Sequence, residues 1–132
     1  MIGIDSNVLL RVLLDDDAAQ AERARRLLAT ECSPQRPAFV NRAVLFEAVW
    51  TLSTGYRYSR AQLASAIELL LAAPALMIED REAVETALDI FTTTRADFAD
   101  CLIGVLNRRA GCATTYTFDR RAAATAEFTV VG

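Results

Sequence analysis

The sequence predicts an α/β fold whose sheet is mostly parallel and contains four to five strands. Short apolar runs alternate along the chain with amphipathic stretches of roughly 10–15 residues that have helical spacing. Strands that alternate with helices in this way are typically parallel and joined by right-handed crossovers. The 132 residues are 53% hydrophobic and 23% charged, so we expect one globular domain over residues 1–132.

The first seven residues hold the first candidate for a functional site. An apolar run over residues 1–4 stops at Asp5, which is typical of a buried strand that presents a carboxylate at its carboxyl end. Ser6 and Asn7 add hydrogen-bonding groups beside it. Asp5 is equally well explained as the N-cap of a helix that begins near Val8, so both interpretations stay open at this point.

The next elements lead to a glutamate on a predicted helix. The acids at positions 15–17 suit the positive end of a helix over residues 18–30. After a turn, residues 38–40 are predicted to form a second strand. A helix over residues 42–54 follows, with Glu47 on the side opposite its core positions. A glutamate there is usually only solvated, so its interest depends on whether other carboxylates face it.

The middle of the chain is predicted to add a helix, a strand and a further helix. Residues 59–62 have the form of a capping box, and the apolar face over residues 63–71 suits either the core or a partner surface. Residues 75–78 are the third candidate strand, and Asp80 is the expected N-cap of a helix over residues 81–92.

Two carboxylates three residues apart are predicted in the first turn of the next helix. Asp97 and Asp100 project there from one face, while apolar neighbours pack inward. Capping explains Asp97 but leaves Asp100 less well explained, because a cap needs only one acid. A fourth strand over residues 112–117 then leads to Asp119, as in the opening motif. A short helix over residues 120–126 and a last strand near residues 128–131 follow.

Missing residue types exclude several classes of chemistry. The chain has no His, and all 14 basic residues are Arg. Ser-His-Asp and Cys-His catalysis, His-ligated zinc, a P-loop lysine and a Schiff-base lysine are therefore excluded. The three cysteines show no CxxC spacing, so we expect small buried hydrophobic residues rather than disulfides or a metal site.

The remaining composition concerns location and surface charge. No apolar run is long enough to span a membrane, and no signal peptide precedes Asp5, so we expect a cytoplasmic protein. The net charge of −3 does not indicate nucleic-acid binding by bulk electrostatics. Local arginine clusters, at residues 23–26, 108–109 and 120–121, can still hold a phosphate backbone.

The predicted topology places the acids at one edge of the sheet. Asp5 and Asp119 follow strand ends, Asp97 and Asp100 begin a helix at the same edge, and Glu47 rises from that side. Carboxylates that close cannot all stay ionised without cations. Oxygen-only groups suit hard divalent ions, magnesium in particular. Two such ions, roughly 3.5–4 Å apart, would activate a water and stabilise the leaving oxygen in phosphodiester hydrolysis.

Together these motifs resemble the spaced signatures of PIN-domain ribonucleases. The matching segments are Asp5-Ser6-Asn7, Glu47, residues 97–104 and Thr117-Phe118-Asp119. In length and spacing the chain is most similar to VapC-type toxins of bacterial toxin-antitoxin pairs. The resemblance implies a three-layer α/β/α fold and an endoribonuclease that depends on Mg²⁺, with Mn²⁺ plausible. It also implies a homodimer and neutralisation by a small DNA-binding antitoxin of the VapB type.

The resemblance also implies roles for single residues. Asp5, Glu47 and Asp100 match the principal metal-site acids of the family, and Asp119 matches its less uniform fourth acid. On this basis we expect Asp5, Asp100 and Asp119 to bind metal and Glu47 to orient a metal-bound water. Asp97 is an additional acid that ranks below Asp100. Accessory roles are expected for the polar neighbours of these acids in the motifs, which are Ser6, Asn7 and Thr117. Gly104 replaces a more usual Ala, which we expect to affect helix packing rather than chemistry.

Two other functions are compatible with parts of the sequence. A PIN-like module without catalysis would act through its helical apolar surface, and the intact set of acids argues against it. A phosphatase or phospho-receiver of similar layout needs a second Asp two residues after the strand-end Asp, or a Lys partner. Position 7 is Asn and the chain has no Lys, so this class is disfavoured.

Overall fold

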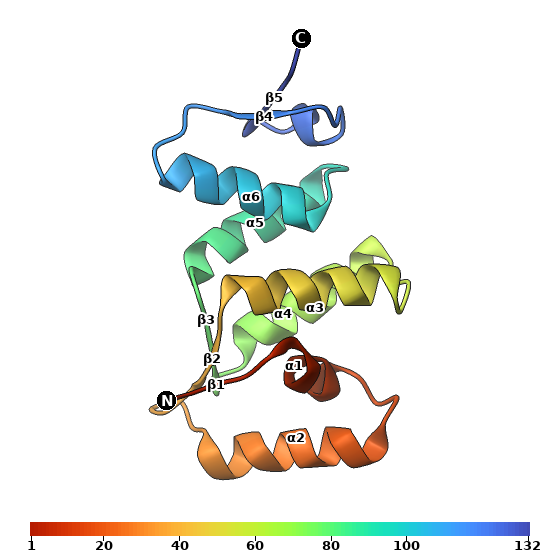
Figure 1. Cartoon of the computed structure of the whole chain (residues 1–132), viewed down its shortest axis with the longest axis vertical. Helices are drawn as coiled ribbons and strands as arrows, with labels where there is room; N and C mark the ends of the chain where they lie inside the picture. The colour runs from red at the N-terminus through yellow and green to blue at the C-terminus, as the bar shows by residue number, and fades with distance from the viewer. The chain divides into compact units, whose positions relative to one another are not determined.

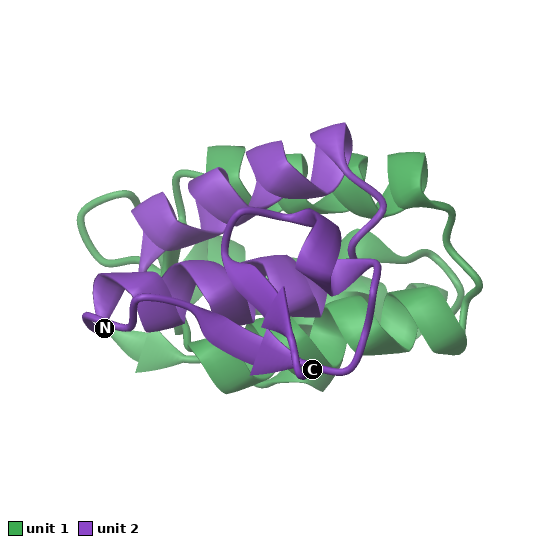
Figure 2. Ribbon diagram, turned by 90° about the horizontal axis from the view of Figure 1, so that it is seen from above, with its two compact units in different colours: residues 1–79 green, residues 80–132 purple.

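The structure is a computed structural model that describes residues 1–132. The chain divides into two compact units, residues 1–79 and residues 80–132 (Figure 2). Both are built from helices and parallel strands, which confirms the predicted α/β class. No helix is long and apolar enough to cross a membrane.

Unit 1 is a three-stranded parallel sheet with four helices (Figure 1). Its elements in chain order are β1 (Ile2–Gly3), α1 (Ser6–Leu13), α2 (Ala18–Glu31), β2 (Ala38–Val40), α3 (Arg42–Thr54), α4 (Arg60–Ala72) and β3 (Leu76–Ile78). The strand order is β1-β2-β3. Ile2 lies opposite Ala38, and Ala38 lies opposite Leu76. All three strands therefore end at one carboxyl edge.

Buried aliphatic side chains hold unit 1 together. Helix α1 packs against α2 and α3, and α4 packs against α3 and β3. The expected capping box of α4 is present, with Ser59 and Gln62 as its members. The apolar face of α4 contributes four buried residues, Leu63, Ala66, Ile67 and Leu70, whereas Leu69 is 64% exposed. The sequence left open whether the apolar face of α4 belongs to the core or to a partner surface. Most of this face is part of the core.

Unit 2 consists of a helix pair and a two-stranded parallel sheet. Its elements are α5 (Arg81–Thr93), α6 (Phe98–Arg109), β4 (Thr115–Thr117), the 3₁₀ helix η1 (Ala122–Ala124) and β5 (Phe128–Val130). Helix α5 packs against α6. Phe91 and Phe98 meet edge to face with their ring centroids 5.9 Å apart. The sequence predicted four to five strands. Five are present, and their hydrogen bonds place three in one sheet and two in another.

Several local expectations need correction. The predicted helix over residues 120–126 is a single 3₁₀ turn, Ala122–Ala124, in which i→i+3 bonds close a short segment. Asp80 is the N-cap of α5 but makes no capping hydrogen bond, because its backbone is left-handed (φ 53°). Of the three free cysteines only Cys101 is buried, while Cys112 is exposed.

Gly104 lies where α6 meets the end of unit 2. A Cβ at this position would lie 2.6 Å from Cε2 of Phe128 and 2.7 Å from Cβ of Glu127. Neither neighbour can yield freely, since Phe128 is buried and the Glu127 carboxylate accepts a hydrogen bond from Arg108. The close approach of α6 to residues 127–128 therefore requires glycine, in agreement with a role in helix packing.

We expect Gly104→Ala to destabilise the protein by about 1 kcal/mol. Overpacking typically costs about 1–3 kcal/mol, and it outweighs the gain of up to about 1 kcal/mol in helix propensity. Urea unfolding followed by circular dichroism measures the change. Ile103→Ala, at the exposed neighbour on the same helix, is the control and should change stability by less than about 0.5 kcal/mol. A Gly104→Ala protein more stable than wild type would contradict the packing argument.

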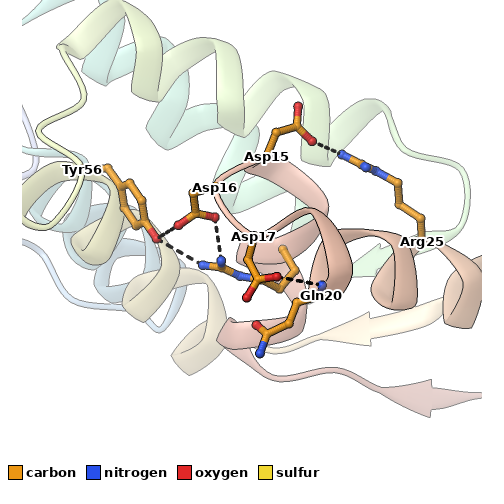
Figure 3. A network of polar contacts seen from close by, with 7 residues as sticks. Asp15, Asp16, Asp17, Gln20, Arg25 and Tyr56 are labelled. Atoms are coloured by element: carbon orange, nitrogen blue, oxygen red, sulfur yellow. Dashed lines mark hydrogen bonds and ion pairs between the residues drawn. The ribbon is translucent and has the colours of Figure 1, made fainter.

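The acids between α1 and α2 form a polar network in unit 1 (Figure 3). Asp17 caps α2 by accepting a hydrogen bond from the Gln20 amide at 3.0 Å. Asp16 receives Nη1 of Arg11 at 2.6 Å and the Tyr56 hydroxyl at 2.6 Å. The hydrogen bond from Tyr56 and the charge of Arg11 lower the pKa of Asp16 below its usual value. The acids thus join the α1–α2 connection to the end of α3.

This network predicts a pH-dependent contribution to stability. Because the folded-state pKa of Asp16 is lowered, its contribution is present above the unfolded pKa of about 3.9 and is lost as the pH falls through the folded pKa. We expect Tyr56→Phe to be less stable than wild type above about pH 5. The difference should shrink as the pH falls below about 3.9, towards the part that the Arg11 hydrogen bond to the Tyr56 hydroxyl contributes at every pH. Urea unfolding at a series of pH values measures it, with Tyr58→Phe as control. An equal difference at every pH would refute this prediction.

Candidate active site

Asp5 lies at the carboxyl end of β1 and also caps α1. Its Oδ1 accepts a hydrogen bond from the Val8 amide at 3.0 Å, and its backbone is extended (φ −90°, ψ 179°). The side chain is exposed. The two interpretations of Asp5 are therefore compatible, because capping uses one carboxylate oxygen and the residue still presents a negative charge at the edge of the sheet.

Ser6 connects this edge to the glutamate on α3. Its side chain is buried, and its hydroxyl donates a hydrogen bond to Oε1 of Glu47. Glu47 itself is exposed, as the helical pattern predicted. Helix α1 packs against α3, and the hydrogen bond from Ser6 spans this contact. It holds the Glu47 carboxylate against Ser6, the neighbour of Asp5 in the chain. Ser6 is thus a positioning residue for Glu47.

Asn7 faces a groove between α1 and α2. The groove has a volume of about 430 Å³ and is lined by Asn7, Val8, Arg11, Gln20, Arg23, Ala24 and Leu27. Its walls carry amide and guanidinium groups as well as aliphatic side chains. The sequence predicted an accessory role for Asn7 but did not predict the groove, because a groove depends on how two helices are placed relative to each other. The position of Arg23, on the face of α2 that turns to α1, was the available signal.

The carboxyl edge of the first sheet carries another acid that sequence reasoning did not single out. Glu79 directly follows β3, and its Oε1 accepts a hydrogen bond from the Arg42 amide at 2.8 Å. Asn41 accepts another from the Val44 amide at 2.9 Å. Together they satisfy the first amides of α3. The position after the third strand was the signal for Glu79, and its observed role is structural.

Three carboxylates approach one another in unit 2. Burial, followed by the negative charges of Asp97 and Asp119, raises the pKa of Asp100, and the charge of Arg121 partly offsets this. Asp97 occupies the N-cap position of α6 but makes no capping hydrogen bond. Capping therefore does not account for Asp97, and the charges of Asp97 and Asp119 both act on Asp100.

Thr117 and the turn after β4 orient Asp119. The Thr117 hydroxyl oxygen accepts a hydrogen bond from the Asp119 amide at 3.0 Å. Oδ1 of Asp119 in turn accepts one from the Arg121 amide at 2.8 Å. These two bonds fix the backbone and the carboxylate at the end of the strand. Thr117 therefore fixes the backbone position of Asp119, and its accessory role in the site stays a prediction.

Arg121 supplies the positive charge beside these acids. Its Nη2 lies 4.0 Å from Oδ2 of Asp97, and its Nε lies 3.9 Å from Oδ1 of Asp119. All three side chains are substantially exposed, so each pair is weak by itself. The sequence showed a cluster at residues 120–121 but not this bridging position. An arginine two residues after the Asp at a strand end was the sequence feature that could have indicated this position.

The donor groups fit a hard divalent cation. Both acid groups offer carboxylate and hydroxyl oxygens, and no sulfur or imidazole ligand accompanies them. Burial raises the pKa of Asp100, and the negative charges of Asp97 and Asp119 raise it further; a bound cation would offset both effects. Neither unit by itself gathers three or more acidic or cysteine side chains in an arrangement able to hold a metal ion.

Comparison with known proteins identifies the family. A sequence model of the PIN domain matches residues 2–128. A VapC ribonuclease from Aquifex aeolicus (strain VF5) is 24% identical over 118 residues, which cover 89% of this chain and 87% of that protein. The matched region contains every acid of both groups, from Asp5 to Asp119. The chain belongs to the PIN-domain family.

Proposed function

We propose that this protein is a divalent-metal-dependent endoribonuclease of the VapC type that hydrolyses RNA phosphodiester bonds. The observation that carries the proposal is the partly buried Asp100 with the charges of Asp97 and Asp119 acting on it, in a PIN-domain chain without His or Lys. Such a chain has no histidine or lysine to act as an acid–base catalyst and is left with carboxylates, so metal-assisted hydrolysis is the chemistry that its residues suit best. The match to a protein named VapC ribonuclease supports the same conclusion.

The proposed ligands are Asp5, Asp100 and Asp119, with Asp97 adding negative charge. When bound, Mg²⁺ or Mn²⁺ would supply charge neutralisation and a more acidic water. Glu47 orients the attacking water by accepting a hydrogen bond from it. The Ser6 hydroxyl, which donates to one oxygen of Glu47, fixes the carboxylate for this role.

Arginines beside the acids suit the backbone of the substrate. Arg95, Arg120 and Arg121 line a hollow of about 420 Å³ in unit 2, together with Thr93, Thr94 and Ala124. Guanidinium forks bind phosphate with two parallel hydrogen bonds. A negatively charged chain can therefore be held here despite the net charge of −3.

The assembly we propose follows the family. The family match extends over both units, residues 2–128, which supports their folding as a single domain. We further propose a homodimer and neutralisation by a small antitoxin of the VapB type, because the relative that matches most of the chain is named a VapC ribonuclease.

Replacing one proposed ligand should abolish RNA cleavage. We expect Asp100→Asn to lower the rate by on the order of 100-fold or more, because the change removes a charge while keeping the shape. Asp89→Asn is the matched control, since it removes an exposed charge from α5 in the same unit and should leave the rate unchanged. Gel analysis of a mixed RNA with added Mg²⁺ or Mn²⁺ measures both. Activity that survives both EDTA and Asp5→Asn would overturn the proposal.

Expression in a bacterium distinguishes the nuclease from a PIN-like binding module without catalysis. We expect the wild-type chain, expressed alone, to arrest growth, because it would destroy cellular RNA, and Asp100→Ala to permit growth. A module that acts by binding through its helical surface would give the same growth curve for both proteins. Immunoblots at equal induction show whether the two proteins accumulate to the same level.

A further inference from the structure

Arg121 belongs to two groups of side chains at once. Its Nη2 lies 4.0 Å from Oδ2 of Asp97, and its Nε lies 3.9 Å from Oδ1 of Asp119. It also lines the hollow of about 420 Å³ that contains Arg95 and Arg120. One guanidinium group is therefore shared by the acids of unit 2, which are proposed for cation binding, and the arginines that are proposed for phosphate binding.

The charge of Arg121 acts on all three acids of this unit. Burial and the charges of Asp97 and Asp119 raise the pKa of Asp100, and the charge of Arg121 partly offsets them. Asp97 stands at the N-cap of α6 without a capping hydrogen bond, so its carboxylate pairs with Arg121 rather than with amides of its own helix. A single positive charge thus partly compensates a group of three carboxylates.

The backbone of Arg121 is held in place, whereas its guanidinium group is exposed. The Arg121 amide donates a hydrogen bond to Oδ1 of Asp119 at 2.8 Å, and Ala122, the next residue, is buried at the start of η1. The Arg121 side chain is 63% exposed and reaches the acids only at 3.9–4.0 Å. Contacts of this kind are weak, so a competing cation can displace the guanidinium group without disturbing the backbone.

We propose that Arg121 is a built-in counter-ion that competes with the divalent cation for the acids of unit 2. This inference rests on the proposed metal-dependent function and adds that loading of the site is opposed from within the chain. Positive charges that share one group of acids repel each other, so Arg121 weakens divalent-ion binding. By linkage, a bound divalent ion weakens the pairing of Arg121 with the acids and leaves its guanidinium for the phosphates of RNA in the hollow.

Calorimetric titration with Mn²⁺ in the absence of RNA measures the competition directly. We expect Arg121→Gln to bind Mn²⁺ about 3-fold to 15-fold more tightly than wild type, because one positive charge near the ion is removed. The substitution keeps the backbone amide that bonds to Asp119. Arg120→Gln is the matched control, since Arg120 lines the same hollow and makes no ion pair with the acids. It should change the affinity by less than about twofold.

The variant Arg121→Lys separates the charge of Arg121 from its shape. Lysine keeps the positive charge, so this variant should bind Mn²⁺ within about twofold of wild type. Thermal unfolding gives a second measurement: Mn²⁺ should raise the melting temperature more for Arg121→Gln than for wild type or Arg121→Lys. Both substitutions are at an exposed side chain and should leave the fold intact. An Arg121→Lys protein that binds Mn²⁺ as tightly as Arg121→Gln would overturn the counter-ion role.

RNA cleavage gives a third measurement, in which the two groups around Arg121 have opposite effects. Arg121→Gln should reach its half-maximal rate at a lower Mn²⁺ concentration than wild type, because the competing charge is gone. Its KM for RNA should be higher, because the hollow loses one guanidinium fork. A structural defect would raise both concentrations, and that result would overturn the inference.

The outcomes separate this inference from the proposed function. If wild type binds Mn²⁺ in an Asp100-dependent way and Arg121→Gln binds it no more tightly, only the counter-ion role is wrong. If Arg120→Gln tightens binding as much as Arg121→Gln does, the effect is one of general surface charge and the inference is overturned. If wild type neither binds Mn²⁺ nor cleaves RNA, both proposals fail.

Discussion

The partial burial of one carboxylate beside two others is the constraint on which the candidate active site depends. Burial and the charges of Asp97 and Asp119 raise the pKa of Asp100, and Arg121 only partly offsets them. Evolution of a stable surface alone would separate such acids, because each added negative charge costs stability. Their placement on α6 and at the end of β4 is therefore best explained by a function that uses concentrated negative charge, of which cation binding is the simplest.

Hydroxyl groups on the neighbouring residues give these acids fixed positions. Ser6 donates to Glu47 in unit 1, and Thr117 accepts from the Asp119 amide in unit 2. Ser6 thus orients a carboxylate directly, and Thr117 fixes the backbone from which the Asp119 carboxylate projects. An acid on a strand end would otherwise sample several rotamers, and cation binding would have to restrict them at an entropic cost. Preorganisation of this kind is more informative about function than the presence of an acid.

Local sequence patterns predicted the elements well, and they predicted contacts poorly. The helix Arg42–Thr54 and the strand Ala38–Val40 match the expected bounds, since hydrophobic period and caps are encoded within each segment. The segment after Asp119 was expected to be a longer helix and is a single 3₁₀ turn, because three alanines favour a helix without specifying its length. The bridging position of Arg121 and the exposure of Cys112 depend on packing, which no window of sequence contains.

The segment from Thr117 to Arg121 shows how backbone geometry distributes chemistry over five consecutive residues. Strand β4 ends at Thr117, and in the bend that follows Phe118 is 83% exposed, whereas Asp119 is less exposed. The turn that follows then brings the Arg121 amide back to the Asp119 carboxylate. A positioning hydroxyl, an exposed ring, an acid and two cations are thereby placed on five consecutive residues. A helix over the same residues would have spread these groups around its circumference, which is a physical reason for the strand to end where the acid begins.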